Sequence, residues 1–359
     1  MYDIAIIGAG PAGATLARLV GHRYRVLLVD KRPLDRPERA ESAAKCCGGL
    51  LAPDAQRMLS KFGLGLPLAV LEEPQLFVVK AIDMNNGRER LYQRHYINMN
   101  RGRFDNWLVS LIPDAVEIRT SCRMTSYTRE TDRFSICMRH GGRRFTEQAR
   151  VLVAAGGATS YVRSPSGKPA KKINAYIAVQ EWVESTRHRP FFTSVFDTDV
   201  TDFYCWTIPK GQALIIGAAL QTDGTAREKF SLYKKKLQQY GFEFGKVLRR
   251  EGAVVIRPSG TGQLRTAEVG RAHIGEAGGW ISPSSAEGLS YAFRSALCLA
   301  ESLSAGLTGF EQRYTAAMKK LQRNIFLKTL KSRVIFNPAL RAAVIRSGLQ
   351  AVRVAHGDR

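Results

Sequence analysis

Three glycines near the start of the chain, Gly8, Gly10 and Gly13, have the spacing G-x-G-x-x-G. They follow a β-branched run, Asp3–Ile7, and precede an alanine- and leucine-rich segment, Ala14–Val20, with helical spacing. In a strand–turn–helix unit, Gly8 allows the tight turn, Gly10 lets a pyrophosphate approach the backbone, and Gly13 lets the helix pack close to the sheet. The N–H groups at the start of the helix would bind the phosphates.

An acidic residue follows the second predicted strand, at the position where a dinucleotide-binding βαβ unit has one. The apolar run Val26–Val29 ends on Asp30, which can accept hydrogen bonds from a ribose 2′-hydroxyl and would repel a 2′-phosphate. The whole βαβ unit therefore predicts a dinucleotide site that does not take NADP. The residues expected to hold the dinucleotide here are Gly8, Gly10, Pro11, Ala12, Gly13, Asp30 and Lys31.

A second strand–glycine–acid turn lies far along the chain, at Ile274–Gly279. Gly275 and Glu276 stand at the end of the predicted strand, where the Glu276 carboxylate can bind ribityl hydroxyls. A helix beginning near Gly288 and Leu289 can direct its free N–H groups at a flavin pyrimidine, where negative charge develops on reduction. Arg101, at the start of another predicted helix, is a further candidate cofactor contact.

The size and cysteine usage of the chain narrow the class of protein. The chain has 359 residues, enough for two or three structural units. No apolar run reaches the roughly 18–20 residues that span a bilayer, and the N-terminal stretch lacks the features of a signal peptide. The cysteines have no metal-ligand spacing and no C-x-x-C pair, which predicts a reduced, cytoplasmic protein without a metal site. They are Cys46, Cys47, Cys122, Cys137, Cys205 and Cys298.

The formal net charge of +23 is extreme for an enzyme. Such a charge favours polyanionic partners, which are nucleic acid, an anionic membrane surface or phosphorylated substrates. No nucleic-acid-binding motif accompanies it, so nucleic acid is the weakest of the three. A general surface bias without a specific partner also remains open.

The order of apolar runs predicts three parts. Residues 1–66, 96–164 and 266–304 form a discontinuous dinucleotide-binding domain. Residues 67–95 and 165–265, rich in β-branched and aromatic residues and interrupted by one helix at 228–239, form an antiparallel sheet that walls a substrate cavity. Residues 305–359 form a basic helical segment.

The basic C-terminal segment allows two interpretations. Apolar residues recur there at helical spacing, namely Phe310, Tyr314, Ala317, Leu321 and Ile325. Cations accompany them, namely Lys319, Lys320, Arg323, Lys328, Lys331 and Arg333. An amphipathic basic helix can lie on an anionic membrane, which would make the protein peripheral at the inner face of that membrane. Alternatively the apolar stripe packs on the domain and the cations are solvated.

The motifs occur in a characteristic order. After G-x-G-x-x-G and Asp30 come Arg-x-x-Phe-Asp at 101–105, Gly-Gly-Ala-x-Ser-x-x-Arg at 156–163 and Gly-Glu-Ala-x-Gly at 275–279. This series resembles the FAD-dependent family that contains aromatic hydroxylases, flavin halogenases and geranylgeranyl reductases. Cys47-Gly48-Gly49 and the run from Tyr204 to Lys210 are similar to motifs of the geranylgeranyl reductase branch. The resemblance covers nearly the whole chain.

The resemblance implies a p-hydroxybenzoate hydroxylase-like α/β architecture, in which a Rossmann-like three-layer ββα domain binds FAD beside an antiparallel substrate domain and a C-terminal helical segment. By matching position, Arg101 and Met124 would contact FAD, and Glu276 would replace the usual Asp. Gly288 and Leu289 would lie near the isoalloxazine, and Cys47, Gly48 and Gly49 by its substrate face. Tyr204 and Trp206 would line the substrate cavity. Gly156 replaces an Asp of the family, which removes an acid that could serve the cofactor or a nicotinamide donor.

The chemistry that follows has three forms. No second G-x-G-x-x-G unit is found, so the flavin would be reduced by transiently docked NAD(P)H, by a protein donor or by the substrate. The first hypothesis is reduction of C=C bonds in an isoprenoid or other apolar, membrane-borne substrate, with Cys47 as the candidate proton donor because a thiol with a pKa of about 8.5 is protonated at neutral pH. Alternatively Cys47 is only a small residue that lets the chain pass the ring.

The second hypothesis is a monooxygenase of an aromatic substrate, or a halogenase with Lys80 as its reactive lysine. The third is a non-enzymatic flavin-binding partner protein.

Overall fold

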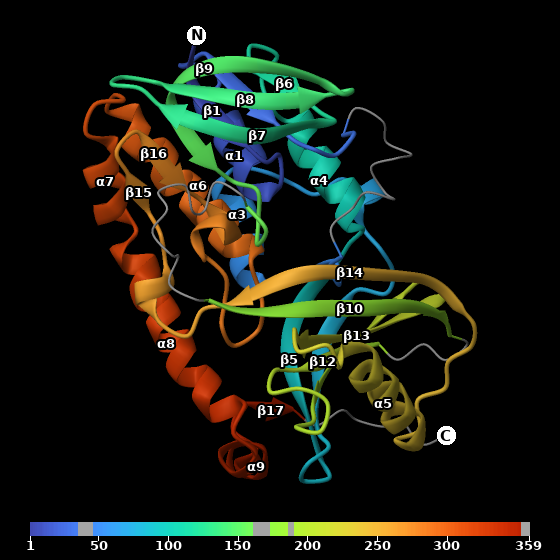
Figure 1. Cartoon of the computed structure of the whole chain (residues 1–359). Coiled ribbons are helices and arrows are strands. Elements are labelled where there is room, and N and C mark those ends of the chain that lie inside the picture. Colours follow the sequence, from blue (N-terminus) through green and yellow to red (C-terminus); the bar gives the residue numbers. More distant parts are fainter. Residues whose placement is uncertain (35–45, 161–172, 186–189, 353–359) are drawn as a thin grey trace.

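The computed structural model describes residues 1–34, 46–160, 173–185 and 190–352. Two lobes, one above the other in Figure 1, are each built on one large sheet. The predicted mixed α/β architecture is confirmed. The last three residues of the 156–163 motif lie outside the described residues.

The upper lobe contains the predicted βαβ unit. Its sheet runs in the order β15-β16-β9-β1-β2-β6, and the strands from β16 to β6 are parallel. The antiparallel pair β7 and β8 continues from β9. The strands are β1 (Tyr2–Ile7), β2 (Val26–Val29), β6 (Glu117–Arg119), β7 (Cys122–Arg129), β8 (Phe134–His140), β9 (Arg143–Ala154), β15 (Ala267–Glu268) and β16 (Arg271–His273).

The upper lobe has three layers, which are the helices, the parallel sheet and the β7–β8 pair, and the side chains of β1 pack against both outer layers. Ile4 and Ile6 face a cluster of helices, whereas Ala5 faces the β7–β8 pair, because successive side chains of a strand point to opposite faces. Both faces of this parallel sheet are covered, which explains why its strands are nearly continuous apolar runs. The helices of this lobe are α1 (Pro11–Val20), α3 (Pro53–Lys61), α4 (Arg101–Ser110), α6 (Leu289–Ser304) and α7 (Phe310–Ala317).

The lower lobe is a nine-stranded sheet in the order β14-β10-β13-β12-β11-β4-β5-β17, with β3 beside β5. The prediction of a purely antiparallel sheet is wrong at one place, because β11 and β4, which come from distant segments, pair in parallel. The strands are β3 (Leu50–Leu51), β4 (Leu76–Asp83), β5 (Arg88–Asn98), β10 (Asn174–Glu184), β11 (Phe191–Phe196), β12 (Cys205–Lys210), β13 (Ala213–Gln221), β14 (Val247–Arg257) and β17 (Ala351–Val352). The predicted helix, α5 (Ala226–Gln239), packs Phe230, Tyr233 and Leu237 on one face of this sheet.

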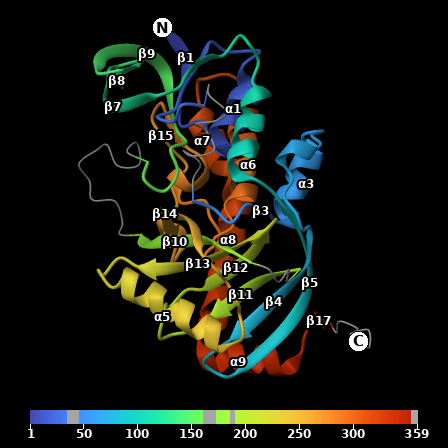
Figure 2. The ribbon, with the colours of Figure 1, turned by 90° about the vertical axis from the view of Figure 1, so that its right-hand side faces the viewer.

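Two C-terminal helices join the lobes. α8 (Lys319–Ile335) descends from the upper lobe to α9 (Pro338–Ser347), which lies beside β5 and β17 (Figure 1). In the turned view, β4 and β5 run down the right-hand side toward α9 (Figure 2). Of the predicted apolar stripe, Phe310, Tyr314, Leu321 and Ile325 are buried. Ala317 is exposed instead, because α7 ends there and the helical phase restarts at Lys319.

None of the described helices is both long enough and apolar enough to cross a bilayer.

Candidate active site

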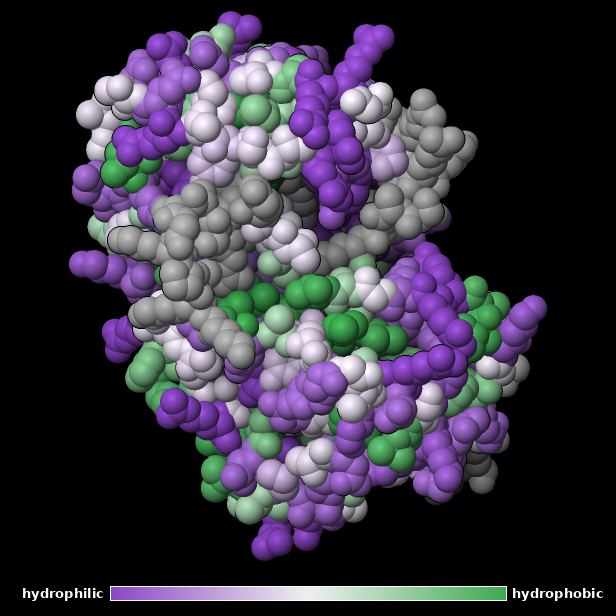
Figure 3. All heavy atoms as spheres, viewed as in Figure 1, coloured by the Kyte–Doolittle hydropathy of each residue, from purple (hydrophilic) through white to green (hydrophobic). Residues whose placement is uncertain are grey.

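A cavity of about 1600 Å³ lies between the lobes. Apolar residues gather in the hollow there, as the space-filling view shows (Figure 3). The structure brings most of the predicted site residues to its walls. Those that line it are Gly8, Gly10, Pro11, Ala12, Asp30, Lys31, Cys47, Gly48, Arg101, Met124, Tyr204, Trp206, Gly275, Glu276, Gly288 and Leu289. Gly13 and Gly49 lie behind this wall.

The glycine turn has the geometry that its spacing predicts. Gly8 has a left-handed φ of +115°, and a Cβ at Gly13 would stand 1.8 Å from the Gly8 carbonyl oxygen. A Cβ at Gly10 would meet nothing within 4 Å, because this glycine borders the open cavity. No side chain caps the start of α1, so its first N–H groups remain available to an anion.

Two acids and two arginines form a buried chain along this end of the cavity. Asp30 Oδ2 accepts from the Ala9 amide at 2.7 Å, and Asp30 Oδ1 accepts from Arg32 Nε at 3.1 Å. Arg32 Nη1 reaches Asp105 at 2.9 Å, and Asp105 accepts from Arg101 Nε at 2.8 Å. A ribose hydroxyl at Asp30 would therefore share the carboxylate with Arg32, a partner that the sequence did not reveal.

The ion pairs among these four residues also determine the charge at the cavity wall. Burial alone would raise the pKa of Asp105, but Arg101 and Arg32 outweigh it and the net shift is downward. Burial would likewise lower the pKa of Arg101. The interactions of Arg101 with Asp105 and Cys47 outweigh this effect, and the net shift of its pKa is upward. Arg101 is therefore held as a permanent cation that faces the Cys47 thiol.

The Cys-Gly-Gly loop has its shape because of protein contacts. A Cβ at Gly48 would stand 2.3 Å from Ile208 Cδ1. Gly49 has a left-handed φ of +62°, and a Cβ there would stand 2.2 Å from the Met99 carbonyl oxygen. Both glycines are thus required for packing, and they present Cys47 at the cavity surface.

Lys210, the last residue of the Tyr204–Lys210 motif, supports this loop from behind. Its Nζ donates to the carbonyl oxygens of Met99 at 2.7 Å and Gly49 at 3.2 Å. Burial lowers the pKa of Lys210 to about 7, although Glu72 and Cys47 act in the opposite direction. The sequence predicted no role for this lysine, because only the fold shows that it is buried.

On the opposite wall, Glu276 lies in the first turn of the short helix η4 (Gly275–Gly278), and its Oε1 accepts from the Ile256 amide at 3.3 Å. Gly156, which replaces the acid of the family, also lines the cavity. The nearest atom to a Cβ at Gly156 would be Ser160 Oγ at 3.3 Å, and this buried hydroxyl has no hydrogen-bond partner among the described residues. It is therefore available to a ligand where the acid is missing.

The start of α6 carries a carboxyl group that the sequence reasoning missed. Gly288 provides no side-chain cap, and the Glu287 carboxylate instead accepts from the Ser290 amide and hydroxyl at 2.7 and 2.6 Å. Burial raises the pKa of Glu287, although Ser290 partly offsets the shift. Glu287 lines the cavity beside Leu289, so a carboxyl group that holds its proton more tightly than usual stands at this wall.

The large sheet forms the apolar floor of the cavity. Tyr204 donates to the Ser285 carbonyl oxygen at 2.8 Å, and its ring lies 5.6 Å from that of Trp206. The Trp206 indole lies over Gly217, where a Cβ would stand 2.2 Å from the ring. The floor spans β12, β11, β4 and β5, which is about 14 Å at the usual spacing between strands.

Lys80 is excluded from the cavity by the alternation of β4. Its neighbours Val79 and Ala81 line the cavity. Lys80 instead pairs with Glu89 at 2.7 Å and lies over the ring of Tyr240. The hypothesis that Lys80 is a reactive lysine in the site is therefore wrong.

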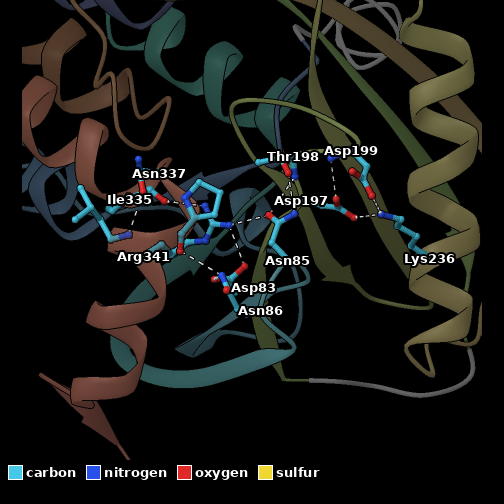
Figure 4. A network of polar contacts seen from close by, with 12 residues as sticks. Asp83, Asn85, Asn86, Asp197, Thr198, Asp199, Lys236, Ile335, Asn337 and Arg341 are labelled. Carbon is cyan, nitrogen blue, oxygen red and sulfur yellow. Dashed lines mark hydrogen bonds and ion pairs between the residues drawn. The ribbon is translucent and has the colours of Figure 1, made fainter.

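At its outer end the cavity is lined by α8 and α9. A buried ion pair anchors α9 to the sheet: Arg341 Nη2 donates to Asp83 Oδ1 and to Asn85 Oδ1, each at 2.9 Å (Figure 4). Asn85 Nδ2 continues the network to Thr198 Oγ1 at 2.8 Å. The C-terminal helices are thus part of the cavity wall.

The chemistry of these walls fits FAD. Within the described parts of the chain, no three His, Cys, Asp or Glu side chains are grouped to hold a metal. By contrast, the uncapped start of α1, the open space at Gly10 and the unpaired Ser160 hydroxyl all border the cavity. The α1 end suits the pyrophosphate, and the Gly288–Leu289 end suits the ring system.

Comparisons with known proteins agree with this fold. A family model described as lycopene cyclase protein matches residues 3–340. CbrA of Escherichia coli O6:H1 is 40% identical over 349 residues, which cover 97% of this chain and 94% of CbrA. Among solved structures, a geranylgeranyl bacteriochlorophyll reductase-like protein of Thermoplasma acidophilum has a TM-score of 0.81 at 17% identity, covering 96% of this chain and 90% of that one. PqsL of Pseudomonas aeruginosa, a probable FAD-dependent monooxygenase, has a TM-score of 0.70 at 17% identity, covering 96% and 99%.

The two solved structures show a shared fold only, because their sequence identities are low. The family match and the relation to CbrA each span nearly the whole chain. The chain therefore belongs to the family described as lycopene cyclase protein, and CbrA is one of its relatives.

Proposed function

We propose that the protein reduces C=C bonds of an isoprenoid or similarly apolar substrate. The supporting observation is that the residues suited to FAD and the apolar sheet floor border one continuous cavity. FAD, when bound, supplies the hydride. A long unsaturated hydrocarbon suits the floor because Tyr204, Trp206 and Phe192 offer it aromatic contacts without a cluster of charges.

The protein's own residues would orient the substrate and deliver a proton. Reduction of one C=C bond adds a hydride to one carbon and a proton to the other, so the site needs an acid near the substrate. Cys47 faces the cavity from a loop that Lys210 and Gln180 hold in place. Glu287 is the second candidate, because its raised pKa keeps more of it protonated near neutral pH.

The electrons would come from a partner in solution. The sequence contains one G-x-G-x-x-G turn, and this turn is part of the wall that suits FAD. We therefore propose that NAD(P)H docks transiently or that a protein donor reduces the flavin.

Anaerobic single turnover tests the proposal. The purified protein is reconstituted with FAD, reduced chemically, and mixed with geranylgeranyl diphosphate. Mass spectrometry should show a product that has gained two hydrogen atoms, while the flavin absorbance returns. The Cys47→Ala and Glu287→Gln variants should bind FAD normally, and loss of turnover in one of them would identify the proton donor.

Other outcomes would redirect the assignment. Rapid oxygen consumption with NAD(P)H, stimulated by a small aromatic compound, would refute the reductase and support a monooxygenase. Bound FAD that neither reduces lipids nor reacts with oxygen in this way would support a binding role. Failure to bind FAD after reconstitution would contradict the family-based assignment of the cofactor.

We also propose that α8 and α9 rest on an anionic membrane from which the substrate enters. Apolar side chains are exposed along this face, namely Phe326, Leu327, Leu330, Val334, Leu340, Val344 and Leu349. Lys319 and Arg323 share a helical face with Phe326 and Leu330 because of their i, i+4, i+7, i+11 spacing. Val334 and Val344 are exposed and also line the cavity, so the face continues into its mouth.

Vesicle flotation tests the membrane proposal. The protein should float with phosphatidylglycerol vesicles and less with phosphatidylcholine vesicles, and Phe326→Ser combined with Leu330→Ser should abolish flotation. Leu248→Ser, which removes an exposed leucine of β14 in the lower lobe, is the matched control and should float normally. Equal flotation of both variants would refute this face as the docking surface.

A further inference from the structure

We propose that Arg94 and Lys331 form a binding subsite for the phosphate or diphosphate head group of an amphiphilic ligand, at the outer end of the cavity. This inference rests on the proposed function, because it names the head group of the apolar substrate. It is carried by side chains that none of the motifs includes.

Three elements converge at this end of the cavity. β5 contributes Tyr92, Arg94 and Tyr96, which alternate along one face of the strand. α8 contributes Lys331, Val334 and Ile335, and α9 contributes Arg341, Val344 and Ile345, each set with the i, i+3, i+4 spacing of one helical face. The result is a compartment with apolar helical walls and cations on both the strand and the helix.

Two of the three cations here, Arg94 and Lys331, are not neutralised by a carboxylate of the described residues. Arg341 is paired with Asp83, so its charge is compensated. Neither Arg94 nor Lys331 has an ion pair with a described residue, and the buried Arg94 Nε has no hydrogen-bond partner among those residues either. The Arg94 guanidinium lies over the Tyr96 ring, 5.5 Å from its centroid, which holds it at the cavity wall.

The acids of the cavity are engaged elsewhere. Asp30 and Asp105 are paired with Arg32 and Arg101 at the opposite end of the site. Glu276 accepts a hydrogen bond from the Ile256 amide, and Glu287 accepts hydrogen bonds from Ser290 at the start of α6. Among the described residues, the outer compartment therefore carries an excess of positive charge.

Arg94 and Lys331 repel each other across this compartment. Lys331 is exposed at the edge of the compartment, but nearby protein atoms partly desolvate its ammonium group and lower its pKa, and the charges of Lys328 and Arg94 lower it further. An anion between the two groups would remove this repulsion. One carboxylate would neutralise only one of these two cations, whereas a phosphate or diphosphate can carry two negative charges. Arginine binds phosphate oxygens with its planar guanidinium, and the lysine ammonium adds a second positive charge.

The neighbouring surfaces indicate that the anion belongs to an amphiphile. Phe192 and Val79 continue the floor from this compartment toward Trp206. A ligand with its head group at Arg94 and Lys331 would lay a hydrocarbon chain along that floor. The structure thus assigns the outer end to the polar group and the inner end to the unsaturated chain.

Calorimetric binding to the oxidised, FAD-loaded protein tests this inference without turnover. The probes are geranylgeranyl diphosphate, the uncharged alcohol geranylgeraniol, and inorganic pyrophosphate. In the variant with Arg94→Met and Lys331→Met, affinity for geranylgeranyl diphosphate should fall by about tenfold or more for each cation removed. Affinity for geranylgeraniol and the FAD content should remain as in the wild type, which also shows that the variant is folded.

Two further variants complete the design. Arg94→Lys combined with Lys331→Arg keeps both charges and should retain most of the affinity. Arg346→Met removes an exposed cation of α9 that does not line the cavity, and it should bind all three probes normally. A fall in affinity with Arg346→Met equal to that of the double variant would refute the subsite, because only the general field of the protein would then matter.

The probes separate the sources of the anion. Weaker binding confined to geranylgeranyl diphosphate would support a lipid head group, and an equal weakening for pyrophosphate would support the same subsite serving a soluble anion. Unchanged binding of geranylgeranyl diphosphate to the double variant would overturn the inference while leaving the proposed reduction intact. If neither isoprenoid bound to the wild type, the proposed function itself would fail.

Discussion

Replacing Lys210 by methionine should change how the stability of this protein depends on pH. Lys210 is 4% exposed and stands behind the loop that presents Cys47. Burial lowers its pKa from 10.5 to about 7. The unfolded chain therefore holds more protons at this group than the folded chain does between these two values.

The sign and size of the effect follow from linkage. Because the unfolded state binds more protons, the free energy of unfolding rises with pH between about 7 and 10.5. Below pH 7 the protein carries the full destabilisation of a charged lysine in a buried place. At about 1.36 kcal/mol for each pKa unit, the stability gained from Lys210 between about pH 6.5 and pH 9 is roughly 2–3 kcal/mol.

Urea unfolding at these two pH values, with FAD saturating in both, measures the prediction. Lys210→Met leaves the carbonyl oxygens of Gly49 and Met99 without this donor, which costs about 1–3 kcal/mol for each at any pH. The difference between wild type and variant should therefore move by about 2–3 kcal/mol in favour of the wild type from low to high pH. Lys235→Met, which removes an exposed lysine of α5, should not alter the wild-type slope. Parallel pH profiles for wild type and Lys210→Met would refute the reasoning.

Two further substitutions test the cavity and its anchor. Gly217→Ala would place a Cβ 2.2 Å from the Trp206 ring and push the indole into the cavity, so affinity for geranylgeraniol should fall about tenfold or more while FAD binding is kept. Gly260→Ala, where a Cβ meets nothing within 4 Å, is the control, and equal affinities in the two variants would contradict the assigned packing of the indole. Arg341→Met would leave the Asp83 carboxylate buried without its cation and should lower the free energy of unfolding by about 3–5 kcal/mol in urea titrations. A change below about 1 kcal/mol would show that α9 is held by other interactions.

The upper lobe was largely predictable because its signals are local. The strand, turn and helix of residues 3–20 are encoded by neighbouring residues, and each glycine has a steric task within a few positions of itself. The start of the helix α6 at Leu289 was equally readable, because an apolar helical pattern follows Gly288 directly.

The lower lobe was less predictable because its pairings join distant segments. β4 lies beside β11 in parallel, and no local pattern distinguishes this pairing from an antiparallel one. Alternation did determine that Lys80 and Val79 face opposite sides, but only the fold shows which side is the cavity. The strand β14 (Val247–Arg257) was not predicted, since its charged residues hide the apolar alternation.

For the C-terminal segment, composition and spacing predicted an amphipathic helix but did not determine what its apolar residues contact. Sequence alone offered packing on the domain or contact with a membrane as alternatives. The structure shows that Leu321 and Ile325 pack inward while Phe326 and Leu330 are exposed on the same helix, so the two interpretations are compatible.

By itself, the sequence determined the dinucleotide turn, the acid that follows it and the family, because these depend on residue types at fixed spacing. The charge states and partners of the site were decided only by tertiary structure. Burial behind a loop lowers the pKa of Lys210, and burial at the start of α6 raises that of Glu287. Arg94 and Lys331, more than two hundred positions apart, face one compartment only because α8 crosses from one lobe to the other. Burial and proximity between distant segments are properties of the folded chain, and no local pattern contains them.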